Sequence, residues 1–294
     1  MILITGANGL IGHAVCEVFN ERNIPVIGVM HTDSGSHFKW ETISVDLASQ
    51  KLNKCIPSEI KIDLVVHCAA KIPESFTSDS DAKCAKINYL IDQNVLEFCV
   101  DNDVALCYMS STSLYGESFI VKDENTALKL ENDYSIEKYE IENKIIKACQ
   151  NYCILRINAP YGARQKNNTV LNLFISNALE NKDLIIFGKG LREQDFTAVE
   201  DIANAVFCYF EKLISGVYVI ATGFSISMKS LAELILKTYP ESKSEIKSVS
   251  VDKVEVGFNS RFDISKANNI LGWESKVSLE KGIENWINYR KLQQ

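Results

Sequence analysis

Ile2-Leu3-Ile4-Thr5-Gly6-Ala7-Asn8-Gly9-Leu10-Ile11-Gly12 opens the chain and decides its fold. A short apolar run meets three glycines and then an amphipathic stretch through Phe19, which predicts a strand, a glycine turn and a helix. Glycines let the backbone turn tightly and approach a pyrophosphate, which lies on the free amides at the helix N-terminus. The turn therefore predicts a dinucleotide site. The residues expected to line it are Gly6, Asn8, Gly9, Leu10, Ile11 and Gly12.

Strands and helices alternate after this turn. Apolar runs at 25–30, 42–45, 62–70 and 104–109 predict buried strands, and a long helix is expected over 79–101. This alternation predicts an α/β fold with a doubly wound parallel sheet of the Rossmann type. Ligands bind beyond the carboxyl ends of such strands. Further cofactor contacts are therefore expected from His31, Asp46, Leu47, Ala69, Ala70 and Asn88.

The choice between NAD and NADP depends on the residues that follow the second predicted strand. An acidic residue that binds the adenosine ribose is expected about 20 residues past the glycines, but Met30 and His31 stand there and Asp33 follows. No arginine or lysine lies between positions 23 and 38, whereas the hydroxyl-rich segment 31–36 can donate to a 2′-phosphate. We therefore expect NAD or NADP, with a slight preference for NADP.

His67 lies inside a predicted strand and is interpreted as a satisfied core residue.

The composition excludes several classes of function. Of the 294 residues, 46% are hydrophobic and 23% charged, which is typical of a globular protein. The formal net charge is −7 without a basic run, so nucleic acid is not an expected partner. The absence of a leader or of an apolar run near 20 residues predicts a cytoplasmic protein without a membrane partner. Nine cysteines without Cys-x-x-Cys spacing predict free thiols and no metal site.

A candidate proton donor lies in the segment 132–142. Tyr134 and Lys138 stand four residues apart, so on a helix they share one face. An ammonium beside a phenol favours the phenolate, so the pKa of Tyr134 is expected to fall toward neutrality. The predicted strand 104–109 ends in a cluster of hydroxyls. Among them Ser111, with Thr112 as the adjacent candidate, is expected to hold a substrate oxygen beside Tyr134.

The glycine turn with Gly-x-x-Gly-x-x-Gly spacing, the serine cluster and Tyr-x-x-x-Lys resemble, in this order, the extended short-chain dehydrogenase/reductase superfamily. The likeness is to its NAD(P)-dependent nucleotide-sugar epimerases, dehydratases and reductases, and it continues through 153–162, 186–190, 195–203 and 263–273. It implies that Tyr134 is the catalytic acid/base. It also implies that Lys138 lowers the pKa of Tyr134 and holds the nicotinamide ribose, and that Ser111 orients the substrate oxygen.

The resemblance also implies the domain organisation. A dinucleotide-binding domain is expected over 1–156, with 196–222 returning to it, and a smaller C-terminal substrate-binding cap over 157–195 and 223–294. Relatives of this kind often form homodimers through two helices, which here are 79–101 and 134–150.

Departures from the family pattern narrow the expected activity. Dehydratases carry an Asp-Glu pair directly after the site hydroxyl, where this chain has Thr112 and Ser113, so dehydration is disfavoured. Epimerases of the galactose type carry an asparagine three residues after the Leu-Arg arginine. Here that position is Ala159, and Asn158 lies one residue early.

The residues expected to recognise the nucleotide diphosphate also differ from the family pattern. The arginine that the family places before Asp-Phe is Gln194, and Arg192 lies two residues earlier. A guanidinium can bind a diphosphate through two hydrogen bonds. The residues expected to contact substrate are Ser111, Thr112, Asn158, Arg192 and Arg261.

These features predict an NAD(P)-dependent enzyme that acts on a nucleotide-linked sugar, as a 4-keto-sugar reductase or an epimerase. One alternative is a reductase of a carbonyl compound that carries no nucleotide. Another is a non-catalytic dinucleotide-sensing protein, although such a protein has no need of Tyr134, Lys138 and Ser111 together.

Overall fold

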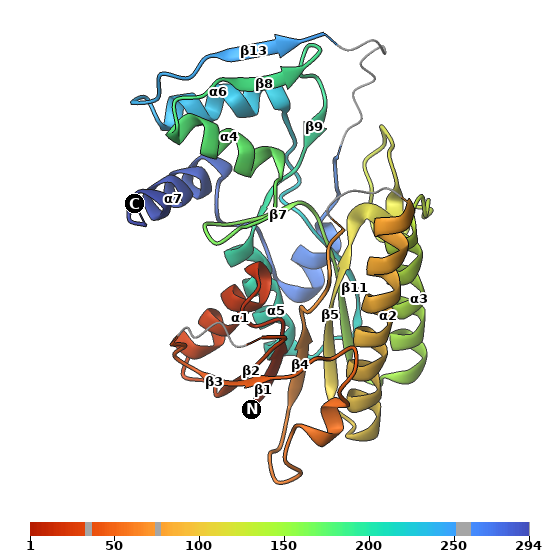
Figure 1. Ribbon diagram of the computed structural model, residues 1–294. Coiled ribbons are helices and arrows are strands. Elements are labelled where there is room, and N and C mark those ends of the chain that lie inside the picture. Colours follow the sequence, from red (N-terminus) through yellow and green to blue (C-terminus); the bar gives the residue numbers. More distant parts are fainter. Residues whose placement is uncertain (33–36, 74–77, 251–259, 294) are drawn as a thin grey trace.

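A seven-stranded parallel sheet forms the centre of the computed structural model, which describes residues 1–32, 37–73, 78–250 and 260–293 (Figure 1). The strand order is β11-β6-β5-β4-β1-β2-β3. The strands are β1 (Ile2–Thr5), β2 (Val26–Met30), β3 (Glu41–Ser44), β4 (Leu64–His67), β5 (Ala105–Ser111), β6 (Tyr152–Ile157) and β11 (Gly216–Ile220). All neighbouring strands pair in parallel, so the predicted doubly wound sheet is confirmed.

Helices cover both faces of this sheet (Figure 1). The pair α1 (Leu10–Glu21) and α5 (Val199–Lys212) packs on one face, and α2 (Ser78–Asp101) with α3 (Asp133–Ala148) packs on the other. Successive side chains of a strand point to opposite faces. Ile2 and Ile4 of β1 therefore join the apolar cluster under α1 and α5, whereas Leu3 joins the cluster under α2 and α3.

A smaller set of helices and short sheets lies beyond the carboxyl ends of the strands (Figure 1). Its helices are α4 (Val170–Leu179), α6 (Met228–Thr238) and α7 (Leu279–Lys291). Three two-stranded sheets pair β7 (Pro160–Tyr161) with β10 (Thr197–Ala198), β9 (Glu193–Gln194) with β12 (Ile226–Ser227), and β8 (Leu184–Phe187) with β13 (Ile246–Val249). A third apolar cluster, which includes the fully buried Trp286, holds these helices together.

Three single turns complete the described elements: η1 (Leu52–Lys54), η2 (Thr112–Tyr115) and a π-helical turn, η3 (Ala267–Leu271). All nine cysteines are free. Within the described ranges, the helices are all too short or too polar to cross a membrane.

Asp201, in the first turn of α5, holds the C-terminal segment 273–277 against this helix. This carboxylate is 1% exposed and accepts hydrogen bonds from Ser275 Oγ (2.8 Å) and from the amides of Lys276 (3.1 Å) and Val277 (3.0 Å). Its backbone carbonyl accepts from Trp273 Nε1 (2.8 Å). A buried carboxylate with several donors organises the chain that crosses it, because each donor would otherwise lose its partner.

Replacing Asp201 with alanine should therefore destabilise the fold by about 2–4 kcal/mol, since three partly buried donors lose their acceptor. Urea denaturation followed by circular dichroism measures this change. The control is Glu241→Ala, which removes only the exposed ion pair with Lys291 and should leave the midpoint nearly unchanged. Equal midpoints for the two variants would show that Asp201 does not fasten the segment.

Candidate active site

The glycine turn lies directly against the end of β4. Gly6 has φ +66°, and a Cβ on it would sit 2.9 Å from both Cα and N of Ala69. A Cβ on Gly12 would sit 2.2 Å from the carbonyl oxygen of Gly6. Neither position has room for a side chain, so these two glycines allow β1, α1 and the end of β4 to meet.

The N-terminus of α1 is open to an anion. Its N-cap residue, Gly9, is extended and makes no side-chain cap, and the first turn holds no acidic residue. Amides in the first turn of a helix have no partner within the helix, and the helix dipole is positive at this end. The exposed Asn8 borders the turn. The predicted pyrophosphate residues thus lie together, in an arrangement that suits a phosphate.

The next two strands end in a pair of exposed polar side chains. His31 Nε2 lies 3.8 Å from Asp46 Oδ1. The carboxylate of Asp46 also accepts from Ser49 Oγ (2.7 Å) and the Ala48 amide (3.1 Å), and these bonds lower its pKa. Leu47 is buried. Asp33, which was considered for the ribose, lies outside the described residues.

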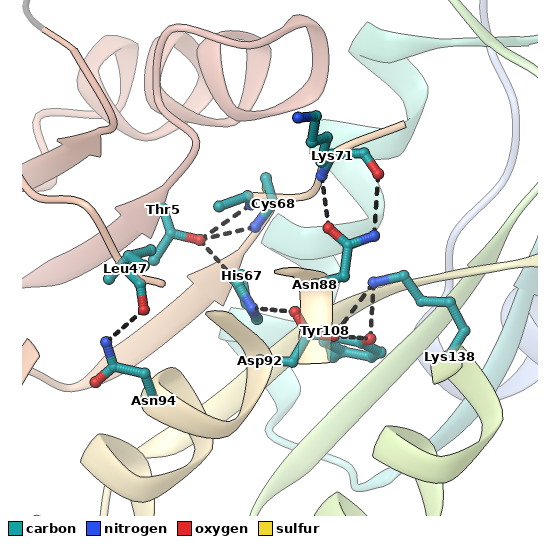
Figure 2. Close-up of polar contacts among 11 residues, drawn as sticks. Thr5, Leu47, His67, Cys68, Lys71, Asn88, Asp92, Asn94, Tyr108 and Lys138 are labelled. Carbon is teal, nitrogen blue, oxygen red and sulfur yellow. Dashed lines mark hydrogen bonds and ion pairs between the residues drawn. The ribbon is translucent and has the colours of Figure 1, made fainter. Parts of the chain in front are cut away.

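Asn88 holds the backbone that passes over the glycine turn (Figure 2). Its side chain is buried, accepts from the Lys71 amide (2.7 Å) and donates to the Lys71 carbonyl (3.0 Å). The segment with Ala69 and Ala70 is thereby fixed between β4 and Lys71. Asn88 in this structure binds backbone, so its effect on a cofactor would pass through Ala69 and Ala70.

The three predicted catalytic side chains come together at the carboxyl end of β5. Asn132 and Ser135 form a capping box that starts α3, which places Tyr134 in the first turn. Ser111 lies close enough to the Tyr134 hydroxyl to lower the pKa of the phenol, and Lys138 Nζ lies 5.9 Å from the centre of the Tyr134 ring. A hydroxyl, a phenol and an ammonium therefore share one site.

The pKa of Tyr134 is raised, so the expected lowering is wrong in this structure. Desolvation of the phenol raises the pKa, Lys138 only partly offsets it, and the carboxyl groups of Glu137 and Asp92 raise it further. Burial of the phenol is the main physical reason. Lys138 is also paired: its Nζ lies 3.3 Å from Asp92 Oδ2 and donates to Tyr108 Oη at 2.7 Å. A paired ammonium acidifies a neighbouring phenol less than a lone one.

A buried polar network surrounds this ion pair (Figure 2). His67 Nδ1 lies 2.6 Å from Thr5 Oγ1, and His67 Nε2 lies 2.9 Å from Asp92 Oδ1. Tyr108 donates to the other oxygen of Asp92. Both nitrogens of His67 thus have partners, which confirms that it is a satisfied core residue.

Thr5, Asp92 and Tyr108 were not among the predicted site residues. One signal was available for Asp92, because it follows Asn88 by four residues and so lies on the same face of α2.

Thr112 and Asn158 contact each other rather than Tyr134. Thr112 Oγ1 donates to Asn158 Oδ1 at 2.9 Å, and Asn158 Nδ2 donates to the Asp195 carbonyl at 2.6 Å. Asn158 is 5% exposed. In this structure it therefore joins the end of β6 to the Asp195 loop, and Ser111 is the hydroxyl beside Tyr134.

The two predicted diphosphate-binding arginines lie at strand β9. Arg261 binds Glu193 through Nε and Nη2, with contacts between 3.0 and 3.3 Å, and the exposed Arg192 is the residue before Glu193. The charge of Arg261 is therefore matched by Glu193, and a diphosphate would have to compete with that carboxylate.

A second buried ion pair joins Glu142 of α3 to Arg156 of β6. Arg156 contacts Glu142 through Nη2 (2.7 Å) and Nε (3.1 Å) and donates to Tyr115 Oη (2.9 Å), while Ser110 Oγ donates to Glu142 (2.5 Å). Glu142 follows Lys138 by four residues, so Arg156 fixes the helix face that carries Lys138. Among the residues that the structure describes, no cluster of histidine, cysteine or carboxylate side chains could hold a metal ion.

Comparisons with known proteins identify the family of the chain. The model of the NAD dependent epimerase/dehydratase family matches residues 2–221. The chain is 29% identical to a putative UDP-glucose 4-epimerase of Methanocaldococcus jannaschii, over 99% of this chain and 98% of the relative. It is 27% identical to a dTDP-4-dehydro-6-deoxyglucose reductase of Escherichia coli, over 97% and 96% of the two chains.

A solved structure shares the whole fold. The UDP-glucose 4-epimerase of Thermotoga maritima, determined with UDP-glucose, superposes with a TM-score of 0.89 at 27% identity and covers 100% of this chain and 99% of its own. Together with the family match over residues 2–221, this likeness shows that the chain belongs to the NAD-dependent epimerase/dehydratase family.

Proposed function

We propose that this protein is an NAD-dependent enzyme that transfers hydride at C4 of a nucleotide-linked sugar, as a 4-epimerase or a 4-keto-sugar reductase. One observation carries the proposal: the Ser111 hydroxyl, the Tyr134 phenol and the Lys138 ammonium lie together at the same edge of the sheet as the glycine turn. Ligands of parallel α/β sheets bind at that edge.

Each side chain has a defined task. Bound NAD supplies the hydride acceptor or, once reduced, the hydride donor. Tyr134 moves the proton to or from the sugar oxygen, and Ser111 orients that oxygen by a hydrogen bond. Lys138 supplies positive charge beside the phenol and a donor for the nicotinamide ribose.

The nucleotide-linked substrate class is supported by the relatives, whose names specify UDP-glucose and a dTDP-linked deoxysugar. We place the substrate in a cap formed by residues 157–195 and 223–294, over a dinucleotide-binding domain of 1–156 and 196–222. Arg192 and Arg261 enter from this cap and offer guanidinium groups to a diphosphate. Dehydration is disfavoured because Thr112 and Ser113 replace the Asp-Glu pair.

NAD is the proposed cofactor, although the polar segment 31–36 favoured NADP slightly. Asp46 lies beside His31 at the strand ends, and a carboxylate there suits ribose hydroxyls better than a 2′-phosphate. A basic hollow of about 490 Å³ borders Asn8, but its guanidinium groups are engaged. Arg164 Nη1 lies 3.1 Å from His13 Nε2, and Arg290 Nη2 donates to Asn172 at 2.9 Å.

A homodimer through α2 and α3 is also proposed. Exposed apolar side chains lie on both helices, namely Leu90, Val100, Ile136, Tyr139 and Ile146. Apolar side chains gathered on neighbouring helices suit an interface between protein chains.

Tyr134→Phe and Ser111→Ala should each lower kcat roughly 10²–10⁴-fold. The first variant loses the group that transfers the proton, and the second loses the hydroxyl that orients the sugar oxygen. The assays are interconversion of UDP-glucose and UDP-galactose, followed by proton NMR, and oxidation of NADH by a dTDP-linked 4-keto-6-deoxysugar. Tyr139→Phe is the matched control, since Tyr139 is an exposed tyrosine of the same helix and phenylalanine keeps the ring at the proposed dimer surface.

Other outcomes would support the alternatives. Turnover of simple ketones that UDP and dTDP do not inhibit would favour a reductase of non-nucleotide carbonyls. Binding of NAD without turnover of any sugar, and a Tyr134→Phe variant with unchanged biological activity, would favour a dinucleotide sensor.

NAD should bind at least tenfold more tightly than NADP, since the 2′-phosphate would approach Asp46; this ratio corresponds to about 1.4 kcal/mol. Isothermal titration calorimetry with both dinucleotides measures it. Tighter binding of NADP that Arg164→Ala abolishes would instead place the 2′-phosphate in the basic hollow.

A further inference from the structure

We propose that Asp92 is a positioning residue for the reaction: its buried carboxylate holds the Lys138 ammonium in place and balances its charge beside Tyr134. The inference rests on the proposed function, which assigns Tyr134 and Lys138 their tasks. Asp92 itself touches neither the phenol nor the helix N-terminus that suits a phosphate.

The burial of the pair makes the partnership necessary. Asp92 and Lys138 are each 1% exposed. A buried ammonium without a counter-charge is costly, and removing one member of a buried pair leaves the other uncompensated. Desolvation opposes the charge of Lys138, but the Asp92 carboxylate keeps the pKa of Lys138 above its ordinary value. The Asp92 carboxylate is therefore the main group that offsets the desolvation of the Lys138 ammonium.

Thr5 at the end of β1 and His67 at the end of β4 set the orientation of Asp92 (Figure 2). Thr5 Oγ1 accepts from the amides of Cys68 and Ala69, both at 3.1 Å, so its own proton is directed to His67 Nδ1. With Nδ1 as the acceptor, the proton on Nε2 is donated to Asp92 Oδ1. Hydrogen bonds thus link the strand end that contacts Gly6 to the ammonium beside Tyr134.

Charged and titratable groups face Lys138 from three directions. Asp92 comes from α2, with His67 of β4 behind it; Tyr108 comes from β5; Tyr134 and Glu137 come from α3 itself. Burial, with the Asp92 carboxylate next in importance, raises the pKa of Glu137 to about 8. Burial likewise raises the pKa of Tyr108.

Below the pKa of Glu137 the cluster therefore carries one negative and one positive charge, on Asp92 and Lys138. The two act on Tyr134 in opposite directions: the ammonium lowers the pKa of the phenol, and the carboxylate raises it. The pH at which Tyr134 titrates therefore reports on the charge of Asp92.

Asp92→Asn keeps the shape of the side chain and removes its charge. We expect kcat to fall at least tenfold, because Lys138 loses the group that holds it, while KM changes little. Without the negative charge the phenol should titrate at a lower pH, because the Asp92 carboxylate raises the pKa of Tyr134. Tyr134 acts as an acid in the reductive direction, so the alkaline decline of kcat should begin at a correspondingly lower pH.

Two measurements read these effects. One is the pH dependence of kcat. The other is carbon-13 NMR of the tyrosine ζ carbons, with the Tyr134 resonance assigned from Tyr134→Phe, and it needs no turnover. A protein that turns over no nucleotide-linked sugar would overturn the proposed function, while the NMR titration would still decide the role of Asp92.

Three further variants sharpen the test. Tyr108→Phe keeps the charge of Asp92, so the Tyr134 titration should stay in place. Asp201→Asn alters a buried carboxylate of α5, on the opposite face of the sheet from α2 and α3, and should lower stability without moving that titration. Asp92→Glu keeps the charge but displaces it, and it should lower kcat even where Asp92→Asn does not fold.

The overturning results are equally defined. A folded Asp92→Asn protein with the kcat and the Tyr134 titration of the wild type would refute the positioning role. So would an Asp92→Glu protein with unchanged kcat, or a Tyr134 titration that moves to higher pH when the carboxylate is removed.

Discussion

The contact between the glycine turn and the end of β4 is the constraint on which the site depends. Gly6 can approach Ala69 because it has no side chain, and Thr5 beside it accepts the amides of Cys68 and Ala69. Thr5 also contacts His67, which begins the buried network that reaches Lys138. The turn that suits a pyrophosphate and the residues suited to proton transfer are therefore parts of one rigid core.

That arrangement explains why the phenol is not acidified as the spacing alone suggested. Four residues between Tyr134 and Lys138 ensure that both lie on one face of α3. The spacing includes neither the burial of the phenol, which raises its pKa most, nor the carboxylate of Asp92, which comes from another helix and pairs with Lys138. Proximity of two side chains on a helix determines a contact, whereas a pKa depends on every charge around the group.

Much of the fold and part of the site followed from local sequence patterns. Apolar runs, the glycine turn and the helix from 79 to 101 predicted the parallel sheet, and Ser111 was expected beside Tyr134 where the structure has it. Contacts between residues far apart in the sequence could not be predicted from these local patterns. Asp92 meets His67 and Tyr108 only through the packing of α2 on β4 and β5, and Arg261 meets Glu193 across 68 positions. Asn158 was expected at the substrate, but its hydrogen bonds to Asp195 and Thr112 depend on a loop whose path no local pattern specifies.

Hydride transfer at the sugar is the central claim, and rapid mixing of the NAD-loaded protein with a nucleotide-linked hexose deuterated at C4 tests it most directly. We expect the near-ultraviolet absorbance of NADH to rise before product forms, and to rise more slowly than with the unlabelled sugar because the transferred bond is broken in that step. Product that forms without reduced cofactor, or that has lost its deuterium to water, would contradict the assignment.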